Sequence, residues 1–205
     1  MGKVRNLYNK LLMKHGPQNW WPCEGEKYGN DEIAIGAILT QNTSWKNVEK
    51  ALFNLKKNNA LSLEAIISLP LKNLAKLIQP SGFYNQKAER LKTFAHYIIS
   101  NYGSLKRFFE HSDDVLNLRE KLLSLKGIGK ETADSILLYA GFKPIFVVDK
   151  YTYRLFLKEG ILDSAEKFDY EKIRKIVEKE IKEVKDMQEF HALIVEEGKA
   201  MRKKS

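Results

Sequence analysis

The stretch LKGIGKETA, residues 125–133, lies between two amphipathic helical patterns and decides the fold. Its two glycines, Gly127 and Gly129, permit a tight turn with positive φ and let a foreign backbone approach closely. Ile128 between them is expected to enter the core and hold the turn. Because the second helix begins directly after Gly129, its free backbone N–H groups and its positive end point outward, where they can bind a phosphate.

The residues beside the glycines favour the same interpretation. Lys126 and Lys130 add positive charge on either side of the turn. A glycine turn between two packed helices is common, but this pattern is much more specific than a lone Gly-x-Gly. We therefore predict that the turn grips one phosphate of a DNA backbone without reading base sequence.

The charge balance of the 205-residue chain points in the same direction. Lysine and arginine total 35, aspartate and glutamate total 26, and the formal net charge is +9. Such an excess favours a polyanionic partner. A basic surface that is merely solvated, as in some thermophile proteins, stays open as an alternative.

Cysteine content and hydropathy narrow the expected compartment. The one cysteine, Cys23, cannot form an intramolecular disulfide, and there is no cysteine cluster for zinc or iron–sulfur. No apolar run is long enough to span a membrane. Residues 1–16 are typical of an amphipathic helix rather than a signal peptide. We therefore expect a cytoplasmic protein, associated with the nucleoid if the source is a prokaryote.

Helical periodicity covers nearly the whole chain and predicts an all-α fold. Residues 146–148 are the one strand-like run, too short and solitary for a sheet, and residues 141–148 are expected to be extended. Asp31 is placed to cap a helix over residues 33–39. The other helices are expected within residues 1–16 and over residues 45–56, 63–68, 71–79, 86–101, 105–111, 114–124, 130–139, 150–159, 170–184 and 188–201.

Asp149 follows this strand-like run and precedes a predicted helix. Aspartate is a strong N-cap residue, and Thr152 stands three residues on. The helix dipole holds a carboxylate at this position as the anion. Such an anion can stabilise positive charge developing on a sugar, or orient and activate a water. A purely structural role as a cap is the alternative.

The hairpin, Asp149 and the spacing between them resemble the HhH-GPD superfamily of DNA glycosylases. The superfamily is named for its helix-hairpin-helix, a Gly/Pro-rich loop and an aspartate. Gly141 and Pro144 stand in that loop here, and Asp149 matches the catalytic acid. The resemblance runs over most of the chain.

This resemblance implies a two-lobed all-α fold with a cleft between the lobes. One lobe would comprise residues 30–146, and the other residues 1–29 and 147–205. Duplex DNA would bind at the cleft, with the damaged nucleotide flipped into it. The carbonyls of Leu125 and Gly127 could hold a monovalent cation, the only metal expected. The implied DNA-binding residues are Gln41, Lys126, Gly127, Ile128, Gly129, Lys130 and Thr132.

The residue at position 131 bears on the type of reaction. Bifunctional members such as endonuclease III carry the pattern Gly-x-Gly-x-Lys-Thr-Ala, in which the lysine attacks the sugar and forms a Schiff base. The matching residue here is Glu131, and a carboxylate cannot form an imine. Lys130 points about 100° around the helix and is a poor substitute. We therefore expect a monofunctional glycosylase in which Asp149 assists a water.

Three further stretches resemble the 3-methyladenine DNA glycosylase III family. They are WWP at residues 20–22, GAILTQNTSW at residues 36–45 and PSGFYNQKA at residues 80–88. The base-pocket residues that this resemblance implies are Trp21 and Trp45, with Pro22 adjacent. Alkylated purines are cationic, and stacking between indoles supplies dispersion and cation–π attraction. Burial in the core is the alternative for these tryptophans.

Other polar residues of this half are candidates for DNA contact. Gln41 matches the position whose side chain fills the gap left by the flipped base. Lys87, at a predicted helix start, and Lys46 could each contact a backbone phosphate, with solvated lysines as the alternative.

Many related enzymes carry a four-cysteine [4Fe–4S] loop at the C-terminus, and its cysteines are missing here. We expect no cofactor, and a monomer. Two alternatives stay open: an endonuclease III-like glycosylase acting on oxidised or mismatched bases, and a non-catalytic DNA-binding module.

Overall fold

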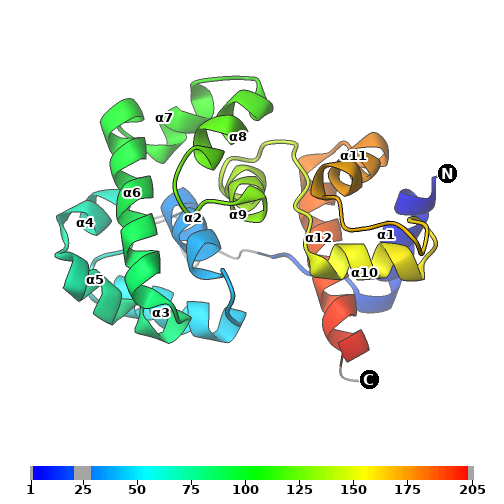
Figure 1. The fold of residues 1–205 in the computed structure, drawn as a ribbon, viewed down its shortest axis with the longest axis horizontal. Helices are drawn as coiled ribbons and strands as arrows, with labels where there is room; N and C mark the ends of the chain where they lie inside the picture. Colours follow the sequence, from blue (N-terminus) through cyan, green and yellow to red (C-terminus); the bar gives the residue numbers. More distant parts are fainter. Residues whose placement is uncertain (1, 21–28, 203–205) are drawn as a thin grey trace. The chain divides into compact units, whose positions relative to one another are not determined.

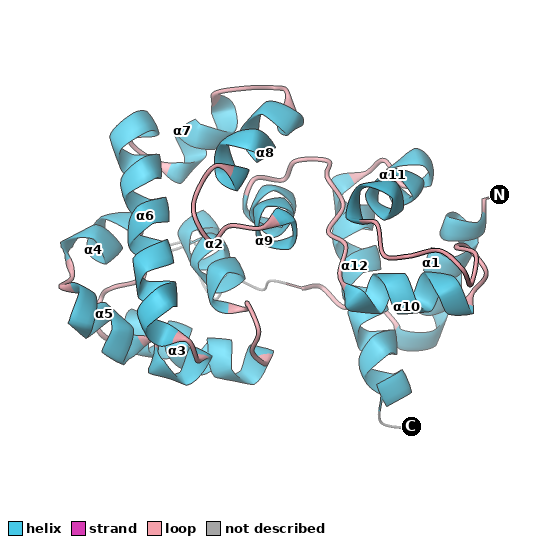
Figure 2. Ribbon diagram, viewed as in Figure 1, coloured by secondary structure: helices cyan, strands magenta, loops and turns pink. Residues whose placement is uncertain are grey.

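The computed structural model describes residues 2–20 and 29–202. Throughout this part the chain forms helices and loops and no strand, which confirms the predicted all-α fold (Figure 2). None of the described helices is long and apolar enough to cross a lipid bilayer. The chain divides into two compact units (Figure 1). A terminal unit combines residues 1–22 and 142–205, and a central unit comprises residues 23–141.

Helix α12 (Val184–Arg202) organises the terminal unit. α1 (Lys3–His15) and α10 (Lys150–Lys158) both pack against α12, and α11 (Tyr170–Glu180) packs against α1. Each of these helices carries apolar residues at helical spacing on one face, so their packing gives the unit a single core.

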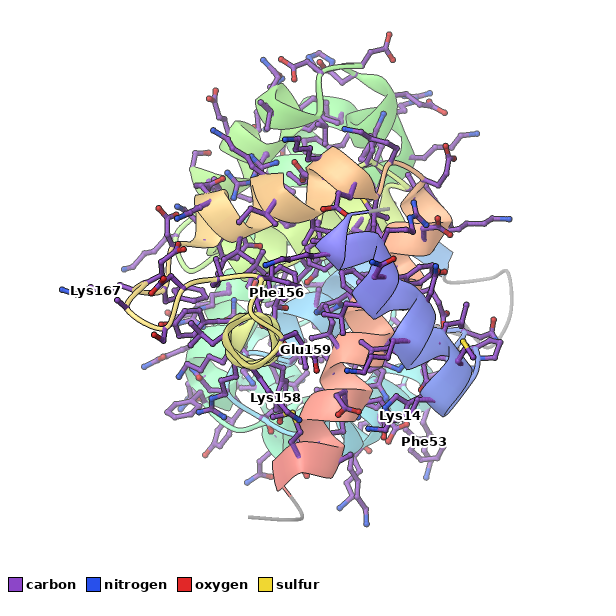
Figure 3. All side chains as sticks on the ribbon, turned by 90° about the vertical axis from the view of Figure 1, so that its right-hand side faces the viewer. Lys14, Phe53, Phe156, Lys158, Glu159 and Lys167 are labelled. Carbon is purple, nitrogen blue, oxygen red and sulfur yellow. The ribbon has the colours of Figure 1, made fainter. Side chains whose placement is uncertain are left out.

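Aromatic side chains fill the core of the terminal unit. Phe190 of α12 is fully buried. Its ring centroid lies 5.7 Å from the centroids of Tyr8 and Phe146 and 6.5 Å from that of Phe156. Phe156 lies on α10, beside α12 (Figure 3). Large rings at tilted and edge-on angles dominate burial in such cores.

Helix α2 (Gly29–Leu39) is the interior helix of the central unit. Every residue from Ile33 to Leu39 is buried, and a helix that is apolar on all sides belongs in the interior. It contacts α3, α6, α9 and η2. The remaining elements of this unit are α3 (Trp45–Lys57), α4 (Leu63–Ser68), α5 (Leu71–Leu77), η1 (Gln79–Ser81), α6 (Tyr84–Tyr102), α7 (Leu105–Glu110), α8 (Val115–Leu123), α9 (Lys130–Ser135) and η2 (Ile136–Ala140).

The start of α2 differs from the prediction. The helix begins at Gly29, so the expectation that Asp31 caps a helix at residue 33 is wrong. Asp31 lies in the first turn, and its carboxylate accepts a hydrogen bond from the backbone N–H of Leu63, 3.0 Å away. Burial raises the pKa of Asp31, and the bond from Leu63 opposes that effect. Asp31 therefore ties α2 to the start of α4.

Two other helices differ from their predicted form or length. The helix predicted over residues 130–139 continues as the π-helix η2 after Ser135, and the N–H of Gly141 donates to the Ile136 carbonyl at 3.0 Å. α11 ends at Glu180 because Ile181 is buried with extended dihedrals, φ −114° and ψ 113°.

A buried carboxylate joins the two ends of the terminal unit. Glu197 of α12 accepts hydrogen bonds from Lys14 at 2.5 Å and from His15 at 2.7 Å, both at the end of α1. Lys14 is labelled in Figure 3. Burial alone would raise the pKa of Glu197, but the bonds from Lys14 and His15 outweigh it, so this pKa lies below its usual value.

We expect Glu197→Gln to lower the free energy of unfolding by about 1.5 kcal/mol at neutral pH, since hydrogen bonds to a charged group are lost. A carboxyl whose folded-state pKa is lowered stabilises the fold fully above its unfolded pKa, about 4.3. That contribution disappears as the pH falls through the folded-state pKa. Urea denaturation at neutral pH and at about pH 3 should therefore show a difference that closes in acid.

Glu196→Gln is the matched control, because Glu196 pairs with Lys199 at the surface. An exposed pair contributes little. A gap between wild type and Glu197→Gln that stays constant with pH would contradict the assignment.

Candidate active site

The hairpin joins α8 to α9. The N–H of Ile128 donates to the Leu125 carbonyl at 3.0 Å and closes the turn, and the Ile128 side chain is buried. The N–H of Ala133 donates to the carbonyl of Gly129, which stands at the N-cap of α9. Lys126, Gly127, Gly129 and Lys130 are exposed. Glycine backbone and lysine charge thus face solvent together.

A buried ion pair braces the two helices of the hairpin. Arg119 of α8 donates from Nε to Oδ1 of Asp134 at 2.6 Å and from Nη2 to Oδ2 at 3.1 Å. Asp134, on α9, is fully buried, and Arg119 is 8% exposed. A planar guanidinium bound to both oxygens of a carboxylate fixes direction as well as distance. The pair therefore sets how α8 and α9 meet at the turn.

The two glycines of the hairpin are needed for different reasons. Gly127 has φ +88°, a value that other residues rarely adopt, and a Cβ there would lie 2.5 Å from Nε of Arg90. Gly129 has φ −92° and ψ 176°, and a Cβ there would meet no atom within 4 Å. Only the first glycine is required by the fold of the hairpin itself.

We expect Gly127→Ala to lower the free energy of unfolding by about 1–2 kcal/mol, because alanine is strained at positive φ. Gly129→Ala, its matched control, should change that free energy by less than about 1 kcal/mol, since it alters only an N-cap. Its methyl group should instead weaken duplex DNA binding by crowding an approaching phosphate. Urea denaturation and a binding titration check both points, and equal destabilisation by the two variants would contradict the distinction.

Gln41 lies against this hairpin. Its Nε2 donates to the Gly127 carbonyl at 3.0 Å and to the Thr132 hydroxyl at 2.8 Å, and its Oε1 accepts from Arg90. The structure therefore brings together three residues that the sequence nominated separately for DNA contact. A carbonyl oxygen has two lone pairs, so the bond from Gln41 leaves one acceptor position on Gly127.

Lys87 has a different role from the one predicted. It is 1% exposed, and its Nζ donates to the carbonyls of Leu39 and Ser81, each at 2.7 Å. The prediction that Lys87 contacts a phosphate is therefore wrong. Burial, followed by the charge of Arg90, lowers the pKa of Lys87 to about 8. Lys87 satisfies the carbonyl at the end of α2 and so fixes the turn that carries Gln41. Lys46 is exposed, and its predicted contact stays a prediction.

In the terminal unit, residues 145–148 position the candidate carboxylate. All four side chains are fully buried, and the backbone has no strand partner. Side chains of α11 bond it instead: the N–H of Phe146 donates to Glu178 at 2.9 Å, and the N–H of Val148 donates to the Tyr170 hydroxyl at 3.3 Å. Buried backbone groups need such partners. The segment is therefore held in place without a sheet.

Asp149 begins α10 with a capping box. Its Oδ1 accepts from the backbone N–H of Thr152 at 2.7 Å and from the Thr152 hydroxyl at 2.8 Å. The Asp149 N–H donates to the same hydroxyl at 3.4 Å. Within the described residues no hydrogen bond reaches Oδ2 of this half-buried side chain. One oxygen thus orients the carboxylate while the other keeps its lone pairs.

His191 of α12 lies in the electrostatic field of Asp149. Burial lowers the pKa of His191, and the negative charge of Asp149 opposes that effect. The ring contacts Phe146 and Trp20 edge-on, with centroid distances of 6.2 and 5.8 Å. The lowered pKa favours the neutral form of the His191 ring.

Of the predicted base-pocket residues, Trp45 is described. It is the first residue of α3 and is 40% exposed. Trp21 and Pro22 lie outside the described residues. Their neighbour Trp20 is half-buried, and Nζ of Lys199 lies 5.5 Å from its ring centroid.

Residues 35–183 match the family of HhH-GPD superfamily base excision DNA repair proteins. The chain belongs to this superfamily. The matched range of this HhH-GPD protein includes the hairpin and Asp149, so the two features predicted from local patterns lie in one recognised domain.

Relatives of this HhH-GPD protein are similar over most of its length. A Methanocaldococcus jannaschii protein, whose name places it among the DNA repair glycosylases, is 48% identical over 197 residues, covering 96% of this chain and 87% of its own. The structure of the H. pylori 3-methyladenine DNA glycosylase bound to 1,N6-ethenoadenine has a TM-score of 0.80 and 34% identity, covering 98% of this chain and 99% of its own. Endonuclease III of Thermotoga maritima is 34% identical over 124 residues, 60% of this chain and 53% of its own.

Sequence reasoning missed Arg90 in this HhH-GPD protein. Its partner Gln41 is 49 positions away, and the pattern of α6 carries no sign of that contact. A basic residue on a solvated helix face is ordinary, so no local signal separated Arg90 from its neighbours.

Proposed function

We propose that this HhH-GPD protein hydrolyses the N-glycosidic bond of alkylated purines such as 3-methyladenine in duplex DNA and does not cleave the strand. Two observations together carry the proposal: Asp149 is a helix-capping carboxylate with one oxygen unbonded within the described residues, and the sequence has Glu131 at the position of the lyase lysine. The likeness to the H. pylori enzyme over nearly both chains supports the substrate class.

Asp149 supplies the chemistry. As the glycosidic bond breaks, positive charge develops on the deoxyribose, and a fixed carboxylate stabilises that charge in the transition state. The N–H and hydroxyl of Thr152 donate to Oδ1, so the carboxylate is already oriented and needs little reorganisation during the reaction. Oδ2 is the atom that would face the sugar or accept a proton from the attacking water.

Glu131 removes the second reaction of the bifunctional relatives. Strand cleavage needs an amine that attacks the sugar and forms an imine, and a carboxylate cannot do so. Lys130 is the adjacent amine, but it lies about 100° around the helix. Base release should therefore leave an intact abasic strand.

The substrate class fits the candidate pocket residues. An N3- or N7-alkylated purine carries positive charge, which an electron-rich indole attracts in addition to stacking. Trp45 is partly exposed and can meet such a base. The glycosidic bond to an alkylated purine is already weakened, so little acid catalysis is required.

The single cysteine also means that these 205 residues hold no four-cysteine [4Fe–4S] cluster by themselves.

The test is base release from duplexes that carry methylated purines, oxidised pyrimidines, 8-oxoguanine or mismatches, each with and without borohydride. We expect release of 3-methyladenine with no strand cleavage and no trapped complex. Release from oxidised or mismatched duplexes alone, with a borohydride-trapped complex, would replace the proposal with the endonuclease III-like alternative, which the T. maritima relative favours. Binding without release from any duplex would support a non-catalytic module.

A further inference from the structure

We propose that Arg90 is a DNA-phosphate contact and a positioning residue: it holds Gln41 on the hairpin in the free protein and exchanges that bond for a phosphodiester oxygen when DNA binds. The proposal rests on the proposed role of the hairpin in DNA binding and adds a residue and an exchange step to it.

The polar atoms of Gln41 are engaged in the free protein. Both protons of its amide nitrogen are used, one by the Gly127 carbonyl at 3.0 Å and one by the Thr132 hydroxyl at 2.8 Å. Its carbonyl oxygen accepts from Arg90. A side chain bonded at three points cannot enter a DNA duplex unless those bonds are replaced. Displacing Arg90 removes one of these three bonds, so it favours the release of Gln41.

Arg90 lies directly on the hairpin. A Cβ on Gly127 would be 2.5 Å from Nε, 2.7 Å from Cδ and 2.8 Å from Cγ of Arg90, so the arginine stem covers the face of this glycine. The side chain is half-buried and reaches past Gly127 to Gln41. The guanidinium is thus beside the turn that the proposed function assigns to a DNA phosphate.

Arg90 lacks an anionic partner within the described residues. Its one hydrogen bond there goes to the neutral amide of Gln41. A like charge also acts on it, because the charge of Arg90 helps to lower the pKa of the buried Lys87. A guanidinium has five N–H donors in a planar fork and is suited to phosphate. A phosphodiester oxygen is therefore a stronger acceptor for this guanidinium than the neutral amide of Gln41.

The exchange couples two events. A phosphate on the hairpin offers Arg90 a charged acceptor, and charge-assisted bonds are about twice as strong as neutral ones. When Arg90 turns to the phosphate, Gln41 loses one of its three bonds, and only those to Gly127 and Thr132 still hold its amide. DNA contact at the hairpin thereby favours insertion of Gln41.

The experiment measures the affinity of the full-length protein for a short duplex carrying a tetrahydrofuran abasic analogue, over a series of salt concentrations. Arg90→Met should bind about tenfold more weakly at low salt, and its log–log salt slope should be smaller by roughly 0.9, the value for one phosphate contact. Arg90→Lys should keep the slope of the wild type. Arg107→Met, which removes an equal charge from α7 of the same unit, is the matched control and should change neither quantity appreciably.

The second readout is the coupling of Arg90 to Gln41. The fold losses in binding for Arg90→Met and Gln41→Ala should not multiply in the double variant, because each single variant already removes the contact that the two residues share in the free protein. A wild-type slope in Arg90→Met, or an equal loss in Arg107→Met, would overturn the proposal. Thermal melts identify a merely structural effect. A variant with a lower Tm and an unchanged salt slope would also overturn the proposal. The duplex carries no alkylated base, so a wrong substrate assignment leaves the result unaffected, whereas a wild type that does not bind the duplex defeats both proposals.

Discussion

Replacing Asp149 with asparagine is expected to lower the single-turnover rate of base release by about 10²- to 10⁴-fold, the range found for removal of a catalytic acid or base. Asparagine is as good an N-cap as aspartate, and its Oδ1 can still accept both bonds from Thr152. The variant therefore removes the negative charge and little else. Rates on a duplex carrying a methylated purine, compared with thermal melts of the same preparations, separate catalysis from folding.

Asp169→Asn is the matched control for this variant. Asp169 caps α11 in the same unit, and its side chain accepts from the N–H of Lys172 at 3.1 Å. The two substitutions make the same chemical change at the same kind of position. We expect Asp169→Asn to release base at the wild-type rate. If Asp149→Asn also kept that rate, Asp149 would be a structural cap and the proposed mechanism would be wrong.

Replacing Asp134 with alanine is expected to lower the free energy of unfolding by about 3–5 kcal/mol, the effect of leaving one member of a buried ion pair without its partner. Arg119 then loses the carboxylate that binds it at two points, and its side chain is only 9% exposed. Because the pair joins α8 to α9, the hairpin should also lose its geometry and duplex binding should weaken. Urea denaturation and a DNA titration measure the two effects.

The double variant Arg119→Met with Asp134→Leu distinguishes a stranded charge from simple loss of a contact. Apolar side chains of similar size often replace a buried ion pair at little cost, so the double variant should regain much of the stability. The exposed pair Lys106–Glu110 gives the control, and Glu110→Ala should have little effect. A double variant as unstable as Asp134→Ala would show that the geometry of the pair itself is required.

The sequence contained enough information for the hairpin and for the carboxylate because both depend on neighbours in the chain. A glycine at positive φ, an apolar residue that fills the turn and a capping box are interactions within a few residues, and their patterns can be read directly. Gly127, Ile128, Asp149 and Thr152 have in the structure the local conformations that their spacing predicted.

Tertiary structure decided the residues whose partners are far away in the chain. From the sequence Lys87 looks like an ordinary surface lysine, but it is buried and donates to the carbonyls of Leu39 and Ser81. Asp31 accepts from the backbone N–H of Leu63 and does not cap its own helix. The docking of Gln41 on the hairpin likewise needs Arg90, from another helix. The sequence by itself determined the all-α class, the hairpin turn and the cap at Asp149, because short-range sterics and hydrogen bonds set them. Only the tertiary structure decided which polar side chains are buried and which are hydrogen-bonded at the hairpin. Burial and long-range hydrogen bonds depend on every helix that surrounds the residue.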